Sequence, residues 1–167
     1  MKDLLLQYTK YNLWANTKLL GFIESAAAKD PAVPDKEIPS SFNTLRKTLY
    51  HIWGAEQVWY KRLNGESLSH LPGSDFNGNF SEFKSQFLSQ SQKFIDYMNQ
   101  IDDNKLLAGF DYKSTEGTPY KNKIWQSIHH CMNHSTFHRG QLITMLRNAG
   151  FTDLSSTDYI TYIREVK

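Results

Sequence analysis

Apolar residues recur at helical spacing over four long stretches of the chain, and each stretch predicts an amphipathic helix. In the first stretch, Leu, Tyr, Trp and Phe fall mostly on one side of a helix that no Pro interrupts. Ser40 or Ser41 is expected to cap the second helix, and Asn64-Gly65 follows its end. Ser81 is expected to cap the third, which stops at Asp102-Asp103-Asn104. The four expected helices cover residues 3–27, about 41–63, 81–101 and 122–148.

The segments between these helices carry residues that break helices. Pro31, Pro34 and Pro39 enforce a loop after the first helix, and residues 66–79 are rich in Ser, Gly, Pro and Asn. Residues 106–123 alternate aromatic and polar positions around a Gly turn, which favours a short β-hairpin. After Gly150, a C-terminal cap, a polar stretch leads to a short closing helix from Asp158 to Ile163.

This order of elements predicts an all-α fold, namely a four-helix bundle with a short C-terminal helix and a small β-hairpin before the fourth long helix. With 167 residues, the chain is expected to form a single domain, residues 1–167, that buries a core without disulfides or metals as staples. Aromatic residues make up 14% of the chain, so Trp, Tyr and Phe are expected to fill much of that core.

Charge and cysteine content exclude several classes of protein. The chain has 19 basic and 17 acidic residues with no basic stripe, which argues against nucleic-acid binding. Its single cysteine, Cys131, excludes an internal disulfide framework and favours a reducing, cytoplasmic location. The N-terminus is polar by its seventh residue, and no apolar run is long enough to span a bilayer.

The stretch His129–Gln141 holds four of the six histidines of the chain. His130, His134 and His138 repeat every fourth residue, so neighbours in this series are offset by only ~40° around a helix. Two imidazoles at this spacing can reach one metal ion. No Glu follows the first His, so the general base of the His-Glu-x-x-His zinc enzymes is missing. An exposed polar stripe is the alternative, but three histidines in register favour a metal or catalytic site.

Other side chains near this face have several possible roles. Cys131, Gln141 and Met145 are expected within about half a turn of His134, while Arg139 points roughly 140° away and is expected to be structural. Cys131 is either a fourth ligand, a reactive thiol or a small buried hydrophobe, and the last is favoured.

The second helix carries His51, whose neighbours on its face, Thr44, Ala55 and Val58, are small. Taken alone, His51 is best explained as a histidine bonded to a carbonyl, but small neighbours leave room for a ligand or a second helix. In a bundle, His51 can face His134 and His138. Glu56 points about 140° away from His51 and is expected to form a salt bridge or support the site from outside.

These pieces together resemble the DinB family of damage-inducible proteins over nearly the whole chain. The matching segments are Tyr11–Asn16 in the first helix, Leu49–Glu56 with Trp59, Arg62-Leu63 and Gly65 in the second, His130–Gln141 in the fourth, and Asp158–Ile160 at the end. The resemblance implies an up-down-down-up left-handed bundle, a homodimer, and one divalent metal ion bound by His51, His134 and His138. It gives His130 no metal role, and a role in supporting the site or lining a pocket fits this residue better.

A three-histidine site with an open position leads us to expect a metal-dependent enzyme acting on small molecules, with a low-molecular-weight thiol as nucleophile and zinc or nickel as the ion. This resembles the thiol-dependent transferases that the family contains. The alternatives are a non-catalytic metal-binding stress-response protein and a metal-dependent hydrolase. Because the ligands must be deprotonated, metal binding is expected to weaken as the pH falls through ~6.5.

Overall fold

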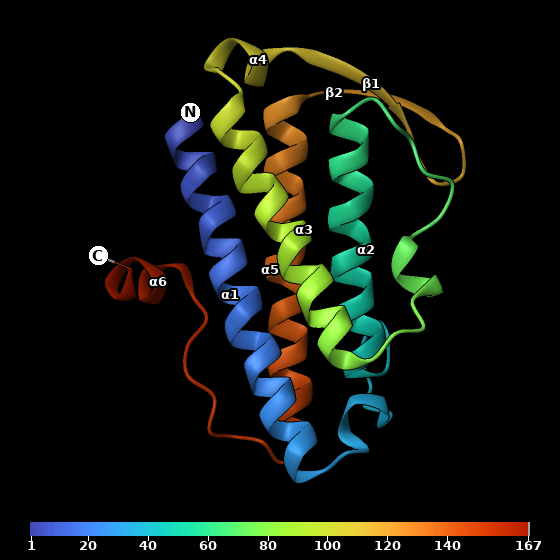
Figure 1. The fold of residues 1–167 in the computed structure, drawn as a ribbon, viewed down its shortest axis with the longest axis vertical. Coiled ribbons are helices and arrows are strands. Elements are labelled where there is room, and N and C mark those ends of the chain that lie inside the picture. Colours follow the sequence, from blue (N-terminus) through green and yellow to red (C-terminus); the bar gives the residue numbers. More distant parts are fainter. Residues whose placement is uncertain (167) are drawn as a thin grey trace.

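Four long helices form an up-down-down-up bundle in the computed structural model, which describes residues 1–166 (Figure 1). The helices are α1 (Lys2–Lys29), α2 (Leu45–Leu63), α3 (Phe80–Gln100) and α5 (Ile124–Asn148). In Figure 1, α1 and α5 run downward while α2 and α3 run upward. The long connection 64–79 returns the chain to the lower end, which is why α3 runs parallel to α2. The predicted fold class is therefore confirmed.

Short elements lie at the ends of the bundle and along α2. The 3-10 helices η1 (Val33–Asp35) and η2 (Pro72–Asp75) lie in the two polar connections. The predicted hairpin is present as antiparallel strands β1 (Gly109–Lys113) and β2 (Pro119–Lys123), and Gly117 has the positive φ that its turn requires. Before it, α4 (Asp103–Leu107) is a helix that the sequence did not predict. Asp102 accepts from the Lys105 amide and so caps α4, in addition to following the end of α3.

Two predicted helix starts were wrong. Thr44 caps α2 by accepting a hydrogen bond from the amide of Lys47, whereas Ser40 or Ser41 was expected to do so. The helix begins later than expected because Asn43, with a φ of 57°, turns the chain just before Thr44. Similarly, α3 begins at Phe80, because Asn79 and Glu82 form a capping box with each other's backbone amides. Ser81 lies inside the first turn of that helix.

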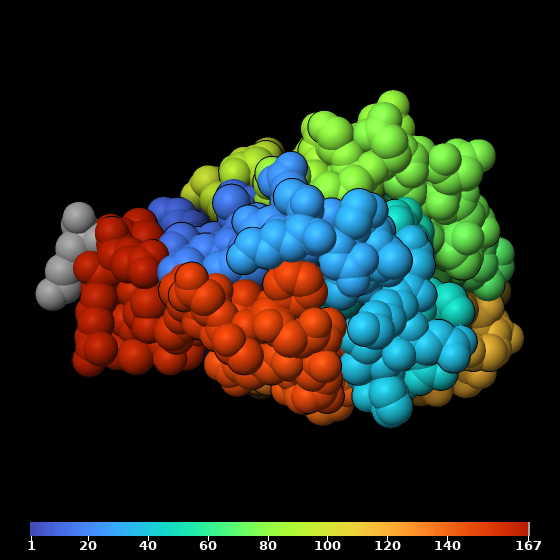
Figure 2. Space-filling model, turned by 90° about the horizontal axis from the view of Figure 1, so that it is seen from below, coloured from blue at the N-terminus to red at the C-terminus, as the bar shows by residue number. Residues whose placement is uncertain are grey.

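The closing helix α6 (Tyr159–Glu165) packs on the outside of α1. Tyr162 is buried there against Tyr11 and the partly buried Trp14, and the Tyr11 hydroxyl donates to the carbonyl oxygen of Thr157. Seen from the end of the bundle, the C-terminal segment stands out to one side (Figure 2). No helix within the described residues is long and apolar enough to cross a membrane.

Candidate metal centre

Helices α2 and α5 pack side by side, and their contact brings three histidines together. His51 comes from α2, and His134 and His138 come from successive turns of α5. One ligand nitrogen from each ring lies within 4.8 Å of the other two. The Nε2 atoms of His51 and His134 are 2.9 Å apart. His134 and His138, which helical spacing predicted to share one face, therefore meet a third imidazole from the facing helix.

All three imidazoles are in an environment that disfavours protonation. Burial, together with the neighbouring His138, lowers the pKa of His51 to about 4. Burial also lowers the pKa of His134 to about 3, with contributions from His138, His51 and His130. Burial lowers the pKa of His138, although its hydrogen bond to Gln141 acts in the opposite direction. Neutral imidazoles are the form that binds metal ions.

Gln141 fixes the orientation of His138. Nδ1 of His138 lies 2.7 Å from Oε1 of Gln141, and Nε2 of Gln141 donates to the hydroxyl of Ser41. Because the amide nitrogen is engaged with Ser41, the amide oxygen faces the ring and Nδ1 must donate to it. Nε2 of His138 then keeps its lone pair for a metal ion. Gln141 thus contacts one of the three converging histidines directly.

The three nitrogens fit a divalent metal ion by their chemistry. They are neutral, they converge, and the buried Nδ1 of His134 has no hydrogen-bond partner among residues 1–166. A histidine that ligates a metal normally donates its second nitrogen to a partner, so His134 lacks a support that His138 has. The group of converging ligands in the described chain contains no carboxylate and no thiol.

A loop and a hollow border the centre on the side of α2. Phe42 stacks on His51, with ring centres 4.1 Å apart, and also approaches His138 at 5.6 Å. Beside His51 lies a hollow of about 350 Å³, a volume in the range of small-molecule sites. Its lining is mainly apolar and is formed by Phe42, Lys47, Tyr50, His51, Leu71, Gly73 and Ser74. A small molecule in this hollow would contact a ring of the metal centre directly.

Glu56 does not face the histidines and is fully buried in a polar network between four helices. Its carboxylate accepts hydrogen bonds from Asn12, Asn16 and Ser91 at 2.8–3.1 Å. The oxygen atoms of the same two amides accept from Arg139, which is 2% exposed. The two asparagines therefore join a buried carboxylate to a buried guanidinium. Burial raises the pKa of Glu56, while these hydrogen bonds and the charge of Arg139 lower it.

Sequence reasoning missed most of this network, although it expected Arg139 to be structural. The available signal was the pair Asn12 and Asn16, which lie at the i, i+4 spacing on the largely apolar face of α1. Unpaired amides are costly in a core, so such a pair indicates buried polar partners.

Cys131 and His130 lie outside the group of three ligands. Cys131 is fully buried beside Phe94 and Met132, where burial raises the pKa of its thiol well above the usual value. The favoured interpretation of Cys131 as a small buried hydrophobe is therefore confirmed, and its thiol is not part of the group of converging ligands. His130 is exposed, with its ring 5.0 Å from that of Trp59 and 6.0 Å from that of His134.

Comparisons with known proteins agree on one family. A model of the DinB family matches residues 1–165 of this chain. Protein DinB of Bacillus subtilis (strain 168) is 26% identical over 170 residues, which cover 98% of this chain and 95% of that protein. The crystal structure of a DinB-like protein from Bacillus subtilis superposes with a TM-score of 0.64 and 14% identity, covering 91% of this chain and 97% of the other. At that identity the structural match supports the fold alone.

Proposed function

The chain belongs to the DinB family, and from this premise we propose that it is a metal-dependent enzyme that joins a low-molecular-weight thiol to a small organic electrophile. The observation that carries the proposal is the convergence of three neutral imidazoles beside a largely apolar hollow, without a carboxylate in the group. The alternative is that the protein binds a metal ion only to stabilise its fold. The test below distinguishes the two functions.

His51, His134 and His138 are the proposed ligands of one divalent ion. Three nitrogen donors leave a coordination position open, which is the arrangement of catalytic rather than structural sites. Borderline nitrogen ligands suit zinc and nickel, and these are the ions that we propose. Support comes from the convergence of the three rings and from Gln141, which presents the free nitrogen of His138.

The chemistry of the reaction follows from the groups around the ligands. When bound, a divalent ion at this site would hold a thiol as its thiolate at neutral pH. The thiol proton leaves to solvent and sulfur forms a bond to the electrophilic carbon. With a halogenated substrate the carbon–halogen bond breaks and halide departs with the electron pair; with an epoxide one carbon–oxygen bond breaks and the oxygen, which stays on the product, takes up a proton from solvent. Phe42, Tyr50 and Leu71 line the hollow beside His51 and would hold the apolar part of the electrophile. Because the bound ion would hold the thiol as its thiolate, the chain needs no separate base to deprotonate the thiol.

A hydrolase is disfavoured because activation of water usually needs a positioned base. The carboxylate of Glu56 is fully buried and already accepts three hydrogen bonds shorter than 3.2 Å. A non-catalytic stress-response protein would be favoured by a fourth protein ligand that closes the site. The thiol of Cys131 cannot act as that fourth ligand, because it is buried in the core beside Phe94 and is not part of the converging group.

The test combines metal analysis with a panel of thiols and electrophiles. Protein purified without a chelating tag should take up about one equivalent of zinc or nickel, and His134→Ala should lose it. His129→Ala, an exposed histidine on the same helix, is the matched control and should keep it. Metal-loaded protein should then accelerate thiol addition to a halogenated or epoxide substrate. Full occupancy with no acceleration of any reaction would favour the non-catalytic alternative.

We also propose that the protein is a homodimer and that it works in the cytoplasm during stress, as a single domain. Support for the dimer comes from large apolar side chains that remain exposed, among them Leu4 at 69%, Phe137 at 61% and Ile160 at 52%. Light scattering at micromolar concentration should give the mass of two chains. A monomer mass would overturn this part of the proposal.

A further inference from the structure

Arg62, in the last turn of α2, is a largely buried arginine whose guanidinium has very few polar partners in the chain. The residue is 8% exposed, and its Nε donates to the carbonyl oxygen of Lys113 at 3.1 Å. Within residues 1–166 it forms no ion pair, and neither Nη atom donates a hydrogen bond. The two Nη atoms are not among the buried polar atoms that lack a partner within residues 1–166, so they reach the surface of the molecule. The two Nη groups are therefore available to an anion from outside the chain.

The other strongly buried arginine shows how the chain satisfies such a group when no ligand is involved. Arg139 is 2% exposed and donates to Asn12, Asn16 and Thr136. Through the two asparagines it is also joined to the carboxylate of Glu56. Arg62 has no comparable set of partners, and its Nη atoms, unlike the enclosed guanidinium of Arg139, reach the surface. Partial burial lowers the pKa of Arg62.

Aromatic rings hold Arg62 in place without using its Nη donors. The guanidinium carbon lies 4.7 Å from the ring centre of Trp59 and 5.0 Å from that of Tyr112. The two rings contact each other edge to face at 5.4 Å. Cation–π contacts stabilise the charge and fix the guanidinium plane, and they leave its in-plane donors open. The hairpin-turn residue Glu116 adds an attractive charge but is exposed and forms no ion pair with Arg62.

This cluster continues the surface of the metal centre along α2 and α5. The ring of His130 is 5.0 Å from Trp59 on one side and 6.0 Å from His134 on the other. On α2, Arg62 follows His51 by eleven residues. Eleven residues correspond to roughly 20° around a helix and about 16 Å along it. Arg62 and His51 therefore lie on the same side of α2, and His130 and Trp59 lie between them.

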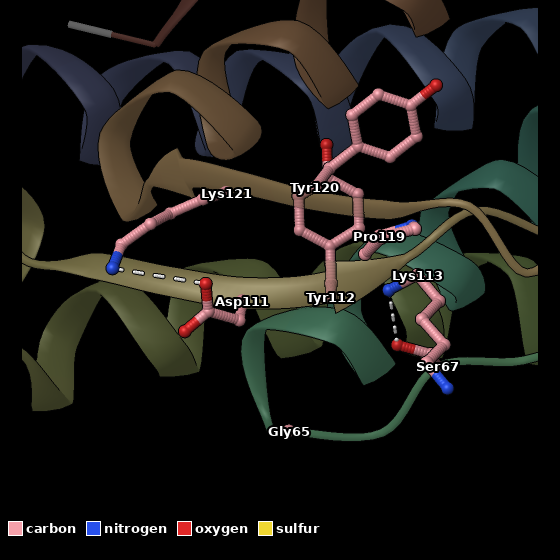
Figure 3. A pocket seen from close by; sticks show the side chains of 8 residues that line it. All are labelled: Gly65, Ser67, Asp111, Tyr112, Lys113, Pro119, Tyr120 and Lys121. Carbon is pink, nitrogen blue, oxygen red and sulfur yellow. Dashed lines mark hydrogen bonds and ion pairs between the residues drawn. The ribbon is translucent and has the colours of Figure 1, made fainter.

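The hairpin leaves space next to this cluster. A hollow of about 670 Å³ is bordered by Tyr112 and Lys113, the two hairpin residues that contact Arg62, as well as by the exposed Tyr120 and Lys121 (Figure 3). In Figure 3 the side chains of Tyr112 and Tyr120 rise from the same side of the hairpin, and their rings stack at 5.8 Å. Asp111 also borders this hollow, and its Oδ1 lies 3.9 Å from the Nζ of Lys121. Arg62 contacts the border residues Tyr112 and Lys113 without lining the hollow itself. The aromatic faces beside the accessible guanidinium suit an aromatic anion.

We propose that Arg62 is the recognition residue of an anion-binding site, and that its ligand is a small molecule with an apolar or aromatic body and an oxyanion group. The planar guanidinium matches the paired oxygens of a carboxylate or phosphate, and the body packs against Trp59 and Tyr112. In the proposed function, this group is the anionic end of the substrate or thiol that reacts at the histidines. Binding of the anion itself requires no metal ion.

The experiment compares matched ligands that differ in charge. Calorimetric titrations with 4-phenylbutyrate, its neutral amide and phenyl phosphate are made at low salt, with metal-free and with zinc-loaded protein. We expect an oxyanion ligand to bind at least tenfold more tightly than the amide in both forms. Whichever oxyanion binds more tightly identifies the group as carboxylate or phosphate. Equal binding of the acids and the amide would overturn the proposal.

Variants test whether Arg62 is responsible. Arg62→Gln should remove the preference for the oxyanion, and Arg62→Lys should keep part of it. Lys10→Gln, which removes an exposed charge on α1, is the matched control and should bind like wild type. An equal loss in Lys10→Gln would indicate unspecific attraction and overturn the proposal. If circular dichroism shows that Arg62→Gln does not fold, the comparison of wild type with Arg62→Lys decides.

Because the titration is made with and without zinc, its outcome separates the two proposals. Oxyanion binding by protein that fails to take up metal would contradict the proposed function and leave the Arg62 site standing. Metal uptake and thiol transfer without a preference for the oxyanion would support the proposed function and contradict the Arg62 site.

Discussion

Oε1 of Gln141 lies 2.7 Å from Nδ1 of His138, and this contact determines which nitrogen of that histidine can bind a metal ion. The amide is itself held by Ser41, which lies in the loop before α2. A residue outside the group of three histidines thus links the loop to the proposed centre.

Gln141→Ala should weaken metal binding without abolishing it. Loss of the hydrogen bond frees the ring of His138 to rotate and to change tautomer, and the loss of such supports typically costs about 10–100-fold in affinity. The affinity is measured by competition with a chromophoric chelator. Thr144→Ala, at an exposed position on the same helix, is the control and should bind like wild type. An unchanged affinity in Gln141→Ala would show that Gln141 does not orient the ligand.

The metal-free protein should lose stability as the pH falls from about 6.5 to about 4. Burial lowers the pKa of His51 to about 4 and that of His134 to about 3, whereas the ordinary value is 6.5. Between these values the unfolded chain binds more protons than the folded chain, so stability increases with pH. The contribution is complete above about pH 6.5 and is lost as the pH falls toward the folded values.

Urea denaturation in the presence of a chelator measures this dependence. His134→Gln removes one of the two groups and should give a flatter profile between pH 4 and 6.5. A wild-type profile that is flat over this range would contradict the lowered pKa values. The sequence led to the expectation that metal binding weakens as the pH falls through ~6.5. Because the pKa values of His51 and His134 are lowered, protons should compete with the metal ion only at a lower pH.

How much of the site the sequence could predict depends on whether the information is local. The i, i+4 spacing of His134 and His138 is a property of one helix, and His51 could be added because facing helices of a bundle bring their inner faces together. Gln141 also follows His138 at a helical spacing, but its contact with Ser41 depends on the loop. That loop turns at Asn43 with a positive φ, which periodicity cannot reveal.

The buried polar groups could not be placed from the sequence. Glu56 was expected near the site or in a salt bridge, and its actual partners come from α1 and α3. The exposure and partners of Arg62 depend on the hairpin, which follows it by some fifty residues. Such contacts are set by how helices and hairpin pack, and no spacing within one element encodes them.

Glu56→Ala should destabilise the fold strongly. The change leaves the amide groups of Asn12 and Asn16 without their acceptor and leaves Arg139 as an uncompensated buried charge. Removal of one partner from a buried network of charges costs about 3–5 kcal/mol. The free energy of unfolding is measured in urea. Glu66→Ala, which breaks only the exposed pair with Lys61, is the control and should cost about 0–1 kcal/mol. Similar small losses in both variants would show that the network is not needed for stability.

Two glycines allow a final, opposed pair of predictions. Gly73 in η2 lies against the backbone of Tyr50, so that a Cβ at position 73 would collide with the carbonyl group of Tyr50. Gly140, in the middle of α5, has open space around the position of a Cβ. Alanine at position 140 should therefore stabilise the protein by about 0.5–1 kcal/mol, because alanine loses less backbone entropy in a helix.

Alanine at position 73 should instead push η2 away from α2, at a cost of about 1–3 kcal/mol. Because Gly73 lines the hollow beside His51, the same change should also alter binding of an apolar ligand there, whereas Gly140→Ala should not. Thermal unfolding gives the stabilities, and titration with a neutral aromatic probe gives the binding. If both variants unfold alike and bind the probe alike, the close approach of η2 to α2 does not shape the hollow. Opposite shifts in stability, with binding changed only in Gly73→Ala, would establish that the width of the hollow is set by this backbone contact.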